Sequence, residues 1–149
     1  MPSPQPTATT LIVETTAGED CPHDFLGDTA DIVYFVSFIA AERYGADHPL
    51  ARAAAVLKRQ LAINLSPLLN FADARTEDAE EEALLERLWQ DAGTLAGCAE
   101  SVATAIEGAP ELRDLTSDFP ELPLRLRELA DIASWAAACG AKIRLTYVI

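Results

Sequence analysis

The sequence contains few positively charged residues. Its 149 residues include 11 lysines and arginines against 24 aspartates and glutamates, which gives a formal net charge of −13. A chain this acidic is repelled by nucleic-acid phosphates and by anionic lipids, because binding to those surfaces depends on lysine and arginine. We therefore expect no direct binding to nucleic acid or to a membrane. The expected partner is a protein, either a basic one or a second copy of the chain in a homo-oligomer.

Long hydrophobic runs are also missing. The most apolar stretch, residues 32–41, is about ten residues long, which is too short to span a bilayer. The first ten residues carry no basic segment and no apolar core, so we expect no secretory signal. The odd number of cysteines, at Cys21, Cys98 and Cys139, then favours a reduced, cytoplasmic protein.

Motifs for catalysis and for metal binding are missing as well. No Gly-x-Ser-x-Gly, P-loop, His-Glu-x-x-His or dinucleotide-binding pattern occurs. The two histidines, His23 and His48, and the three cysteines lack the short paired spacings of a zinc site, so we expect no metal ion and no cofactor. Cys21 and His23 form the one local thiol–base pair, but Asp20 and Asp24 surround it with negative charge, which disfavours a thiolate nucleophile.

The residues that are abundant point to helices. Half of the residues are hydrophobic and many of these are alanine, whereas aromatic residues make up 7%. Closely packed helices use alanine-rich cores, while sheets favour β-branched and aromatic residues. The length fits one domain, which we place at residues 9–149, after a disordered, proline-rich tail at residues 1–8.

Apolar residues recur at helical spacing in four long segments. We expect a first helix at residues 28–44, which is apolar on nearly every side and hence belongs at the centre of a bundle or in a subunit interface. The second begins at Pro49 and continues its apolar stripe through Pro67, where we expect a kink rather than the start of a separate short helix. The third spans residues 76–107 and the last residues 122–139. The stripe of the third helix consists of Leu85, Leu88, Ala92, Leu95, Ala99, Val102 and Ile106.

The third helical segment has three further features. Acidic residues crowd its first turns at 77–82, where the helix dipole favours anions, so we interpret them as a solvated face rather than a cation or partner site. Gly93 and Gly97 indicate close approach of another backbone, or else a hinge between two shorter helices. A short turn at residues 73–76 would make the second and third helices antiparallel neighbours.

Short strands are expected at both ends of the chain, at residues 9–16 and 142–149. An isolated apolar strand leaves its backbone groups unpaired, so the two strands either pair with each other or pair with another subunit. A further short turn of helix is expected within the proline-punctuated residues 110–123. The sequence thus predicts a mainly α fold, an antiparallel bundle of about four helices with a short β-strand at each terminus.

Two sets of side chains are candidates for binding. The first set would line a ligand pocket between the first and last helices, although the default role of such rings is to fill the core; it consists of Tyr34, Phe38, Trp135 and Arg125. The second set would form a protein interface and consists of Trp89, Tyr147, Val148 and Ile149.

A small basic group lies near the proline-punctuated segment and consists of Arg113, Arg125 and Arg127. Such a group can bind a phosphate or a carboxylate. Because no glycine-rich loop accompanies it, we interpret it as a solvated surface.

The leading functional hypothesis is a non-enzymatic protein–protein interaction or regulatory module. It rests on the missing catalytic motifs, the acidic composition and the apolar elements at residues 28–44 and 142–149. The alternative is a helical bundle that binds a small molecule, with or without enzymatic activity, in the pocket between the first and last helices. A third hypothesis, an acidic inhibitor or nucleic-acid mimic, requires a continuous negative stripe.

Overall fold

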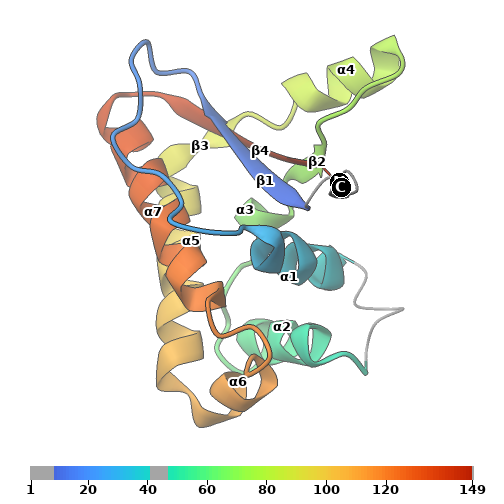
Figure 1. Cartoon of the computed structure of the whole chain (residues 1–149), viewed down its shortest axis with the longest axis vertical. Helices are drawn as coiled ribbons and strands as arrows, with labels where there is room; N and C mark the ends of the chain where they lie inside the picture. The colour runs from blue at the N-terminus through green and yellow to red at the C-terminus, as the bar shows by residue number, and fades with distance from the viewer. Residues whose placement is uncertain (1–8, 41–46, 149) are drawn as a thin grey trace, which may run out of the picture.

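The computed structural model describes residues 9–40 and 47–148, and most of these residues are helical (Figure 1). The helices in this part of the chain are α1 (Ala30–Ala40), α2 (Pro49–Arg59), α3 (Ser66–Leu69), α4 (Ala79–Glu86), α5 (Ala92–Gly108), α6 (Pro110–Leu115) and α7 (Leu122–Ala138). The strands there are β1 (Thr10–Thr15), β2 (Phe71–Asp73), β3 (Gln90–Asp91) and β4 (Lys142–Val148). The mainly helical prediction is confirmed. The antiparallel four-helix bundle is not, because the helices pack on a sheet.

The sheet is built around β4, its central strand. β1 pairs with β4 in an antiparallel ladder that runs from Thr10 opposite Val148 to Thr15 opposite Ile143. On the other side of β4, β2 pairs parallel and β3 pairs antiparallel. The two strands predicted at the chain ends are confirmed, and they pair with each other within one chain. β2 and β3 were not predicted, so the strands are not only terminal.

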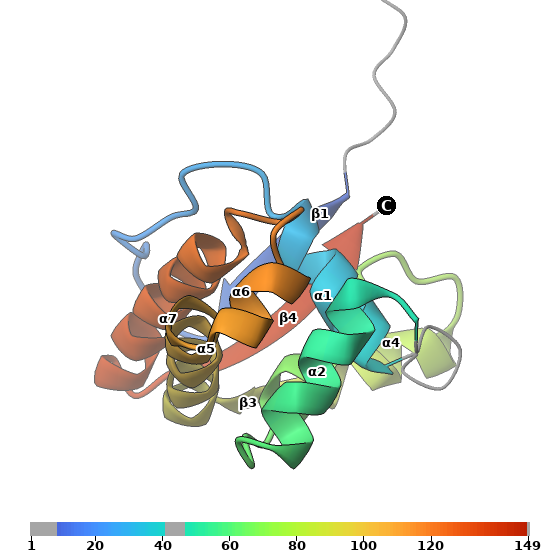
Figure 2. The same ribbon diagram turned by 90° about the horizontal axis from the view of Figure 1, so that it is seen from below.

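One face of the sheet packs on the helices. The inward residues Leu11, Ile143 and Leu145 are at most 4% exposed and join the same core cluster as the buried side chains of α1, α5 and α7. Figure 2, seen from below, shows the helices in front of the strands. α1 is buried on most sides as expected, although its prediction extended to residues 41–44, which lie outside the described residues, as does the tail at residues 1–8.

α5 and α7 form an antiparallel hairpin joined through α6 (Figure 1). α7 matches the predicted last helix, and α6 matches the predicted short turn. Gly140 follows α7 with a φ of 70°, a left-handed conformation that glycine adopts without steric cost. The predicted stripe of α7 is fully buried and consists of Leu122, Leu126, Leu129, Ala133 and Ala136.

The prediction of a single helix at residues 76–107 is wrong, because α4, β3 and α5 occupy this segment. α4 ends at Glu86, and the chain then pairs Gln90 with Ile143 as β3 before α5 begins. Asp91 caps α5, since its carboxylate accepts a hydrogen bond from the N–H of Thr94 at 2.8 Å. The predicted hinge is also misplaced, because the break falls before the two glycines at 93 and 97, which lie inside α5.

Close approach of another backbone does not explain these two glycines. A Cβ added to Gly97 would meet nothing within 4 Å, and one added to Gly93 would have ordinary contacts, with Asp91 Oδ2 at 3.4 Å and Ala137 Cβ at 3.9 Å. Leu85, the first residue of the predicted stripe, lies on α4 outside the core, whereas the rest of the stripe from Leu88 onward is buried.

The kink predicted at Pro67 is a break. α2 ends at Arg59, and Ala62 adopts a φ of 54°, which no helix interior accommodates. Pro67 then lies in the first turn of the separate helix α3, the position that proline tolerates best. The turn predicted at residues 73–76 begins one residue inside β2, so β2 and its pairing with β4 separate the second and third helical segments.

Candidate functional site

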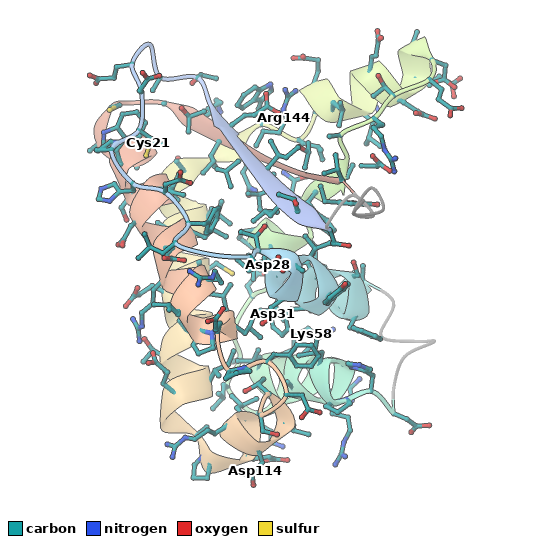
Figure 3. The ribbon with its side chains drawn as sticks, viewed as in Figure 1. Cys21, Asp28, Asp31, Lys58, Asp114 and Arg144 are labelled. Atoms are coloured by element: carbon teal, nitrogen blue, oxygen red, sulfur yellow. The ribbon has the colours of Figure 1, made fainter. Side chains whose placement is uncertain are left out.

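The sheet has an outer face, opposite the helical core, which is covered in part: Thr146 is 1% exposed and the side chain of Arg144 is 13% exposed. Successive side chains of a strand point to opposite faces, so the partners of the core residues lie on this outer face. They include two residues of β1 and three of β4, namely Ile12, Glu14, Arg144, Thr146 and Val148. Figure 3 shows Arg144 between β1 and α4.

Arg144 fastens several segments to the outer face. Its Nη2 lies 2.9 Å from the carboxylate of Glu14, and its Nη1 donates to the carbonyl of Leu85 at 3.3 Å and lies 3.7 Å from Glu86. Its guanidinium also lies over the ring of Trp89, 4.4 Å from the centroid, in a cation–π contact. The positive charge of Arg144 is therefore engaged within the chain, and the side chain is only 13% exposed.

α4 projects from one corner of the molecule (Figure 1). None of its residues is buried, and Leu84 is 46% exposed. Asp78 caps the helix by accepting a hydrogen bond from the N–H of Glu81 at 2.8 Å, and three glutamates occupy the first turn. The cap and the favourable interaction of the glutamates with the helix dipole stabilise α4 although it packs little apolar surface.

Grooves flank α4 on two sides. One, of about 540 Å³, lies between α4 and the end of β2, where Asp73 and Arg75 form an ion pair of 3.2 Å. The other, of about 460 Å³, lies between α4 and Arg144. Leu85 lines both grooves, so a partner that reaches either one meets an apolar side chain beside carboxylates.

The predicted interface residues are divided between the two faces of the sheet. Trp89, stacked on Arg144, and Val148 lie on the outer face. Tyr147 lies on the inner face, where its ring centroid is 4.7 Å from that of Phe71 and packs against the core. Ile149 lies outside the described residues.

The predicted pocket residues have separate surroundings. Arg125 and Trp135 are ten residues apart on α7, which corresponds to about 15 Å along the helix axis. Tyr34 is 43% exposed on α1, and Phe38 stacks on His48 with ring centroids 3.7 Å apart. A common pocket for these side chains stays a prediction.

Arg125 holds a buried charge cluster that fastens the loop before α1 to α7. Arg125 is 3% exposed and Glu128 8%, and the two form an ion pair. The second carboxylate oxygen of Glu128 accepts a hydrogen bond from the N–H of Leu26 at 3.0 Å. Gly27 lies so close that an added Cβ would be 2.5 Å from the guanidinium of Arg125. The cluster therefore acts as a clamp between residues 26–27 and α7, and we call it the loop clamp.

The pKa values of Arg125 and of the nearby Asp31 are both raised, which favours the charged form of the arginine and the neutral form of the aspartate. Glu128, and then Glu121 at 3.4 Å, hold the pKa of Arg125 above its usual value. The pKa of Asp31, in the first turn of α1, is raised mainly by burial and then by repulsion from Asp28 and Glu121, although Arg125 opposes the shift.

The three arginines singled out in the sequence do not converge on an anion site. Arg127 bridges α7 to α5 by ion pairs with Glu100, at 2.5 Å, and with Glu107. Arg113 donates to the carbonyl of Glu107 at 2.8 Å. The interpretation of the group as a solvated surface is wrong for Arg125, which is buried.

The cysteines do not form a reactive site with the histidines. Cys98 donates to the carbonyl of Asn64 at 3.4 Å, and burial raises its pKa to about 11. Cys139 is exposed, but its pKa is raised by partial desolvation and then by Glu19, whose carboxylate lies 3.6 Å from the sulfur. Within the described ranges, no three His, Cys, Asp or Glu side chains gather as metal ligands.

Comparisons with known proteins add no functional information. A scan against protein-family models found no match, and searches of curated proteins and of solved structures found none either. In the part of the chain that the structure describes, no helix is long and apolar enough to cross a membrane. The geometry of the outer face, the grooves and the loop clamp is therefore the basis for a functional proposal.

Proposed function

We propose that this chain is a non-enzymatic protein-binding module that docks a basic partner protein on the outer face of the sheet and on α4. The observation that carries the proposal is the exposed helix α4. It presents Glu80, Glu81 and Glu82 beside the exposed Leu84 and buries none of its own residues. We therefore assign to these acids the partner-binding role that the sequence alone disfavours.

The charges around α4 favour a basic partner. Arg75 pairs with Asp73, and Arg144 pairs with Glu14 and with Glu86 at the last turn of α4, where Arg87 caps the helix. Arg144 and Arg87 thus lie away from the first turn of α4, which carries Glu80, Glu81 and Glu82. A lysine- or arginine-rich surface would gain attraction during approach and would suppress acidic competitors. Two copies of the chain, each with a net charge of −13, would repel at this surface.

Apolar anchors complement the charge. Leu84 and Leu85 line the groove between α4 and β2, and Trp89 lies on the same outer face beside Arg144. Aromatic and aliphatic side chains bordered by charges are typical of protein interfaces. A reduced, cytoplasmic setting belongs to the same proposal, because all three cysteines are free thiols.

The test is capture of a stoichiometric partner from the native lysate, with a matched pair of triple variants. Glu80→Gln, Glu81→Gln and Glu82→Gln remove charge from α4. The control neutralises three exposed acids in and after α6, with Glu111→Gln, Asp114→Asn and Asp118→Asn.

Asp114 lies at the opposite end of the molecule from α4 (Figure 3), so the control variant changes the net charge equally without touching α4. We expect the α4 variant to bind the purified partner at least about tenfold more weakly by calorimetry, with binding by the control unchanged. Equal losses in both variants, or the absence of a stoichiometric partner, would contradict the proposal.

A further inference from the structure

β1 is an edge strand with open backbone groups on one side. The strand order places β4 on one side of β1 and no strand on the other. The N–H of Leu11 donates to Thr29 Oγ1 at 2.8 Å, so it points away from β4. Alternate residues of an antiparallel ladder share this direction, which places the N–H and C=O groups of Val13 and Thr15 on the outer edge. Within residues 9–40 and 47–148, neither N–H has a hydrogen-bond partner.

A groove of about 410 Å³ runs along this edge on the inner side of the sheet. Figure 1 shows the loop after β1 crossing in front of α7 and returning to α1, so this loop forms the far wall. The loop clamp holds residues 26–27 against α7, which keeps the wall in place without a ligand. The larger apolar side chains of the lining are Leu11, Val13, Phe25 and Ile132.

The charged residues of the groove are all acidic. Glu19, Asp20 and Asp24 line it, and no lysine or arginine does. Asp24 accepts a hydrogen bond from the N–H of Phe25 at 2.8 Å, which fixes its carboxylate on the loop. The lining thus combines an apolar floor with carboxylates at its rim, an arrangement that suits the aliphatic stem and cationic head of lysine or arginine.

We propose that the open edge of β1 binds an extended basic peptide by strand addition. The peptide backbone pairs with Val13 and Thr15, and an inward lysine or arginine enters the groove between Ile132 and the carboxylate of Asp20. Backbone pairing supplies affinity in this binding mode, and the pocket for alternate side chains supplies specificity. The site lies apart from α4, so this inference goes beyond the proposed function and does not rest on it.

A second copy of the chain is a poor occupant of this edge. Symmetric pairing of β1 with β1 would bring two sets of Glu19, Asp20 and Asp24 to one edge. Like charges that face each other across strands are destabilising. A basic segment of another protein relieves this repulsion, so charge complementarity selects the peptide over the dimer.

The test uses a fluorescein-labelled octapeptide of alternating valine and lysine. Binding is measured by fluorescence anisotropy, and hydrogen exchange of the N–H groups of Val13 and Thr15 is measured by NMR. We expect exchange at both positions to slow when the peptide is bound. The same peptide with every backbone amide N-methylated keeps its lysine charges but has no backbone N–H to donate. We expect it to bind at least about tenfold more weakly.

Protein variants separate the groove from α4. Asp20→Asn with Asp24→Asn should weaken peptide binding about fivefold, while the matched pair Glu111→Gln and Asp114→Asn leaves it unchanged. Val13→Pro removes a donor that faces the open edge, so the ladder with β4 keeps its bonds while strand addition is blocked.

Several results would overturn the inference. These are equal binding of the N-methylated peptide, unchanged exchange at the β1 edge, or a dimer in light scattering that protects the same two N–H groups. Loss of peptide binding in the triple α4 variant, with full binding in the Asp20 and Asp24 variant, would overturn it while supporting the proposed function of α4. If Val13→Pro does not fold, the comparison of the two peptides decides alone.

Discussion

Replacing Arg125 by methionine tests whether the loop clamp is a buried ion pair that stabilises the fold. Methionine keeps most of the aliphatic volume but leaves the carboxylate of Glu128 without its cation, in a side chain that is 10% exposed. Removing one partner of a buried pair costs about 3–5 kcal/mol. We expect a cost at the lower end, about 3 kcal/mol, because the N–H of Leu26 still donates to Glu128.

The double variant Arg125→Met, Glu128→Leu should be more stable than the single variant. It removes both charges, and the remaining cost is the N–H of Leu26, which loses its acceptor and accounts for about 1 kcal/mol. Arg127→Met is the matched control on the same helix. Its ion pairs with Glu100 and Glu107 are far more exposed than the Arg125 pair, so the free energy of unfolding should fall by about 1 kcal/mol or less.

The assay is urea denaturation at pH 7, followed by circular dichroism at about 222 nm, a wavelength that reports helix. With an m-value of about 2 kcal/mol per molar urea, Arg125→Met lowers the midpoint by about 1.5 M. Amide exchange in residues 26–29 should rise in the same variant, since the clamp holds that segment. Equal stabilities for Arg125→Met and Arg127→Met, or a double variant less stable than the single one, would refute the reasoning.

Three further predictions concern single side chains. The pKa of Asp31 is raised in the folded state, so ionisation of its carboxyl destabilises the fold as pH rises. Asp31→Asn should therefore raise the urea midpoint at pH 7. The gain should fade as pH falls and disappear below pH 3.8, the pKa of an unperturbed aspartate. Ala62→Gly should increase the free energy of unfolding by up to about 1 kcal/mol, because glycine adopts the φ of 54° without strain, and an unchanged urea midpoint would count against that strain. Cys98, with a pKa of about 11, should react with iodoacetamide at pH 8 about a hundredfold more slowly in the native protein than after unfolding, as read by mass spectrometry.

The elements predicted correctly are those whose signals are local. α7 has a full apolar stripe and is followed by Gly140, and the strands β1 and β4 have β-branched alternation. The errors lie where distant pairing overrides local periodicity. Gln90 continues a helical pattern in the sequence, yet its backbone pairs with Ile143 near the end of the chain. β2 was not predicted either, because its three residues are too few to show the alternation of a strand and its pairing with β4 is distant in sequence.

The candidate surfaces were predicted only in part. Trp89 and Val148 were singled out in the sequence and lie on the outer face, whereas Arg144, which organises that face, was not. Strand alternation could have found Arg144, because it lies between the apolar residues Ile143 and Leu145 of a predicted strand. No sequence pattern could have shown that the loop with Glu19, Asp20 and Asp24 returns beside the edge of β1. The loop clamp holds it there by a hydrogen bond between Leu26 and Glu128, which are far apart in the sequence.

The use of the arginines inside the fold explains why the acidic surfaces remain open to basic partners. Arg125 and Arg127 fasten α7 to the loop and to α5, and Arg144 fastens β4 to β1 and α4. The chain has 11 basic residues against 24 acidic ones, so most carboxylates have no basic side chain to pair with. Because these three arginines are engaged in internal contacts, they do not neutralise carboxylates elsewhere on the surface. In the described chain the excess of acids includes α4 and the loop beside β1, where exposed acids adjoin unfilled grooves. Repulsion within each cluster costs stability that a basic ligand restores, so the internal ion pairs that hold the fold together also direct binding to these two places.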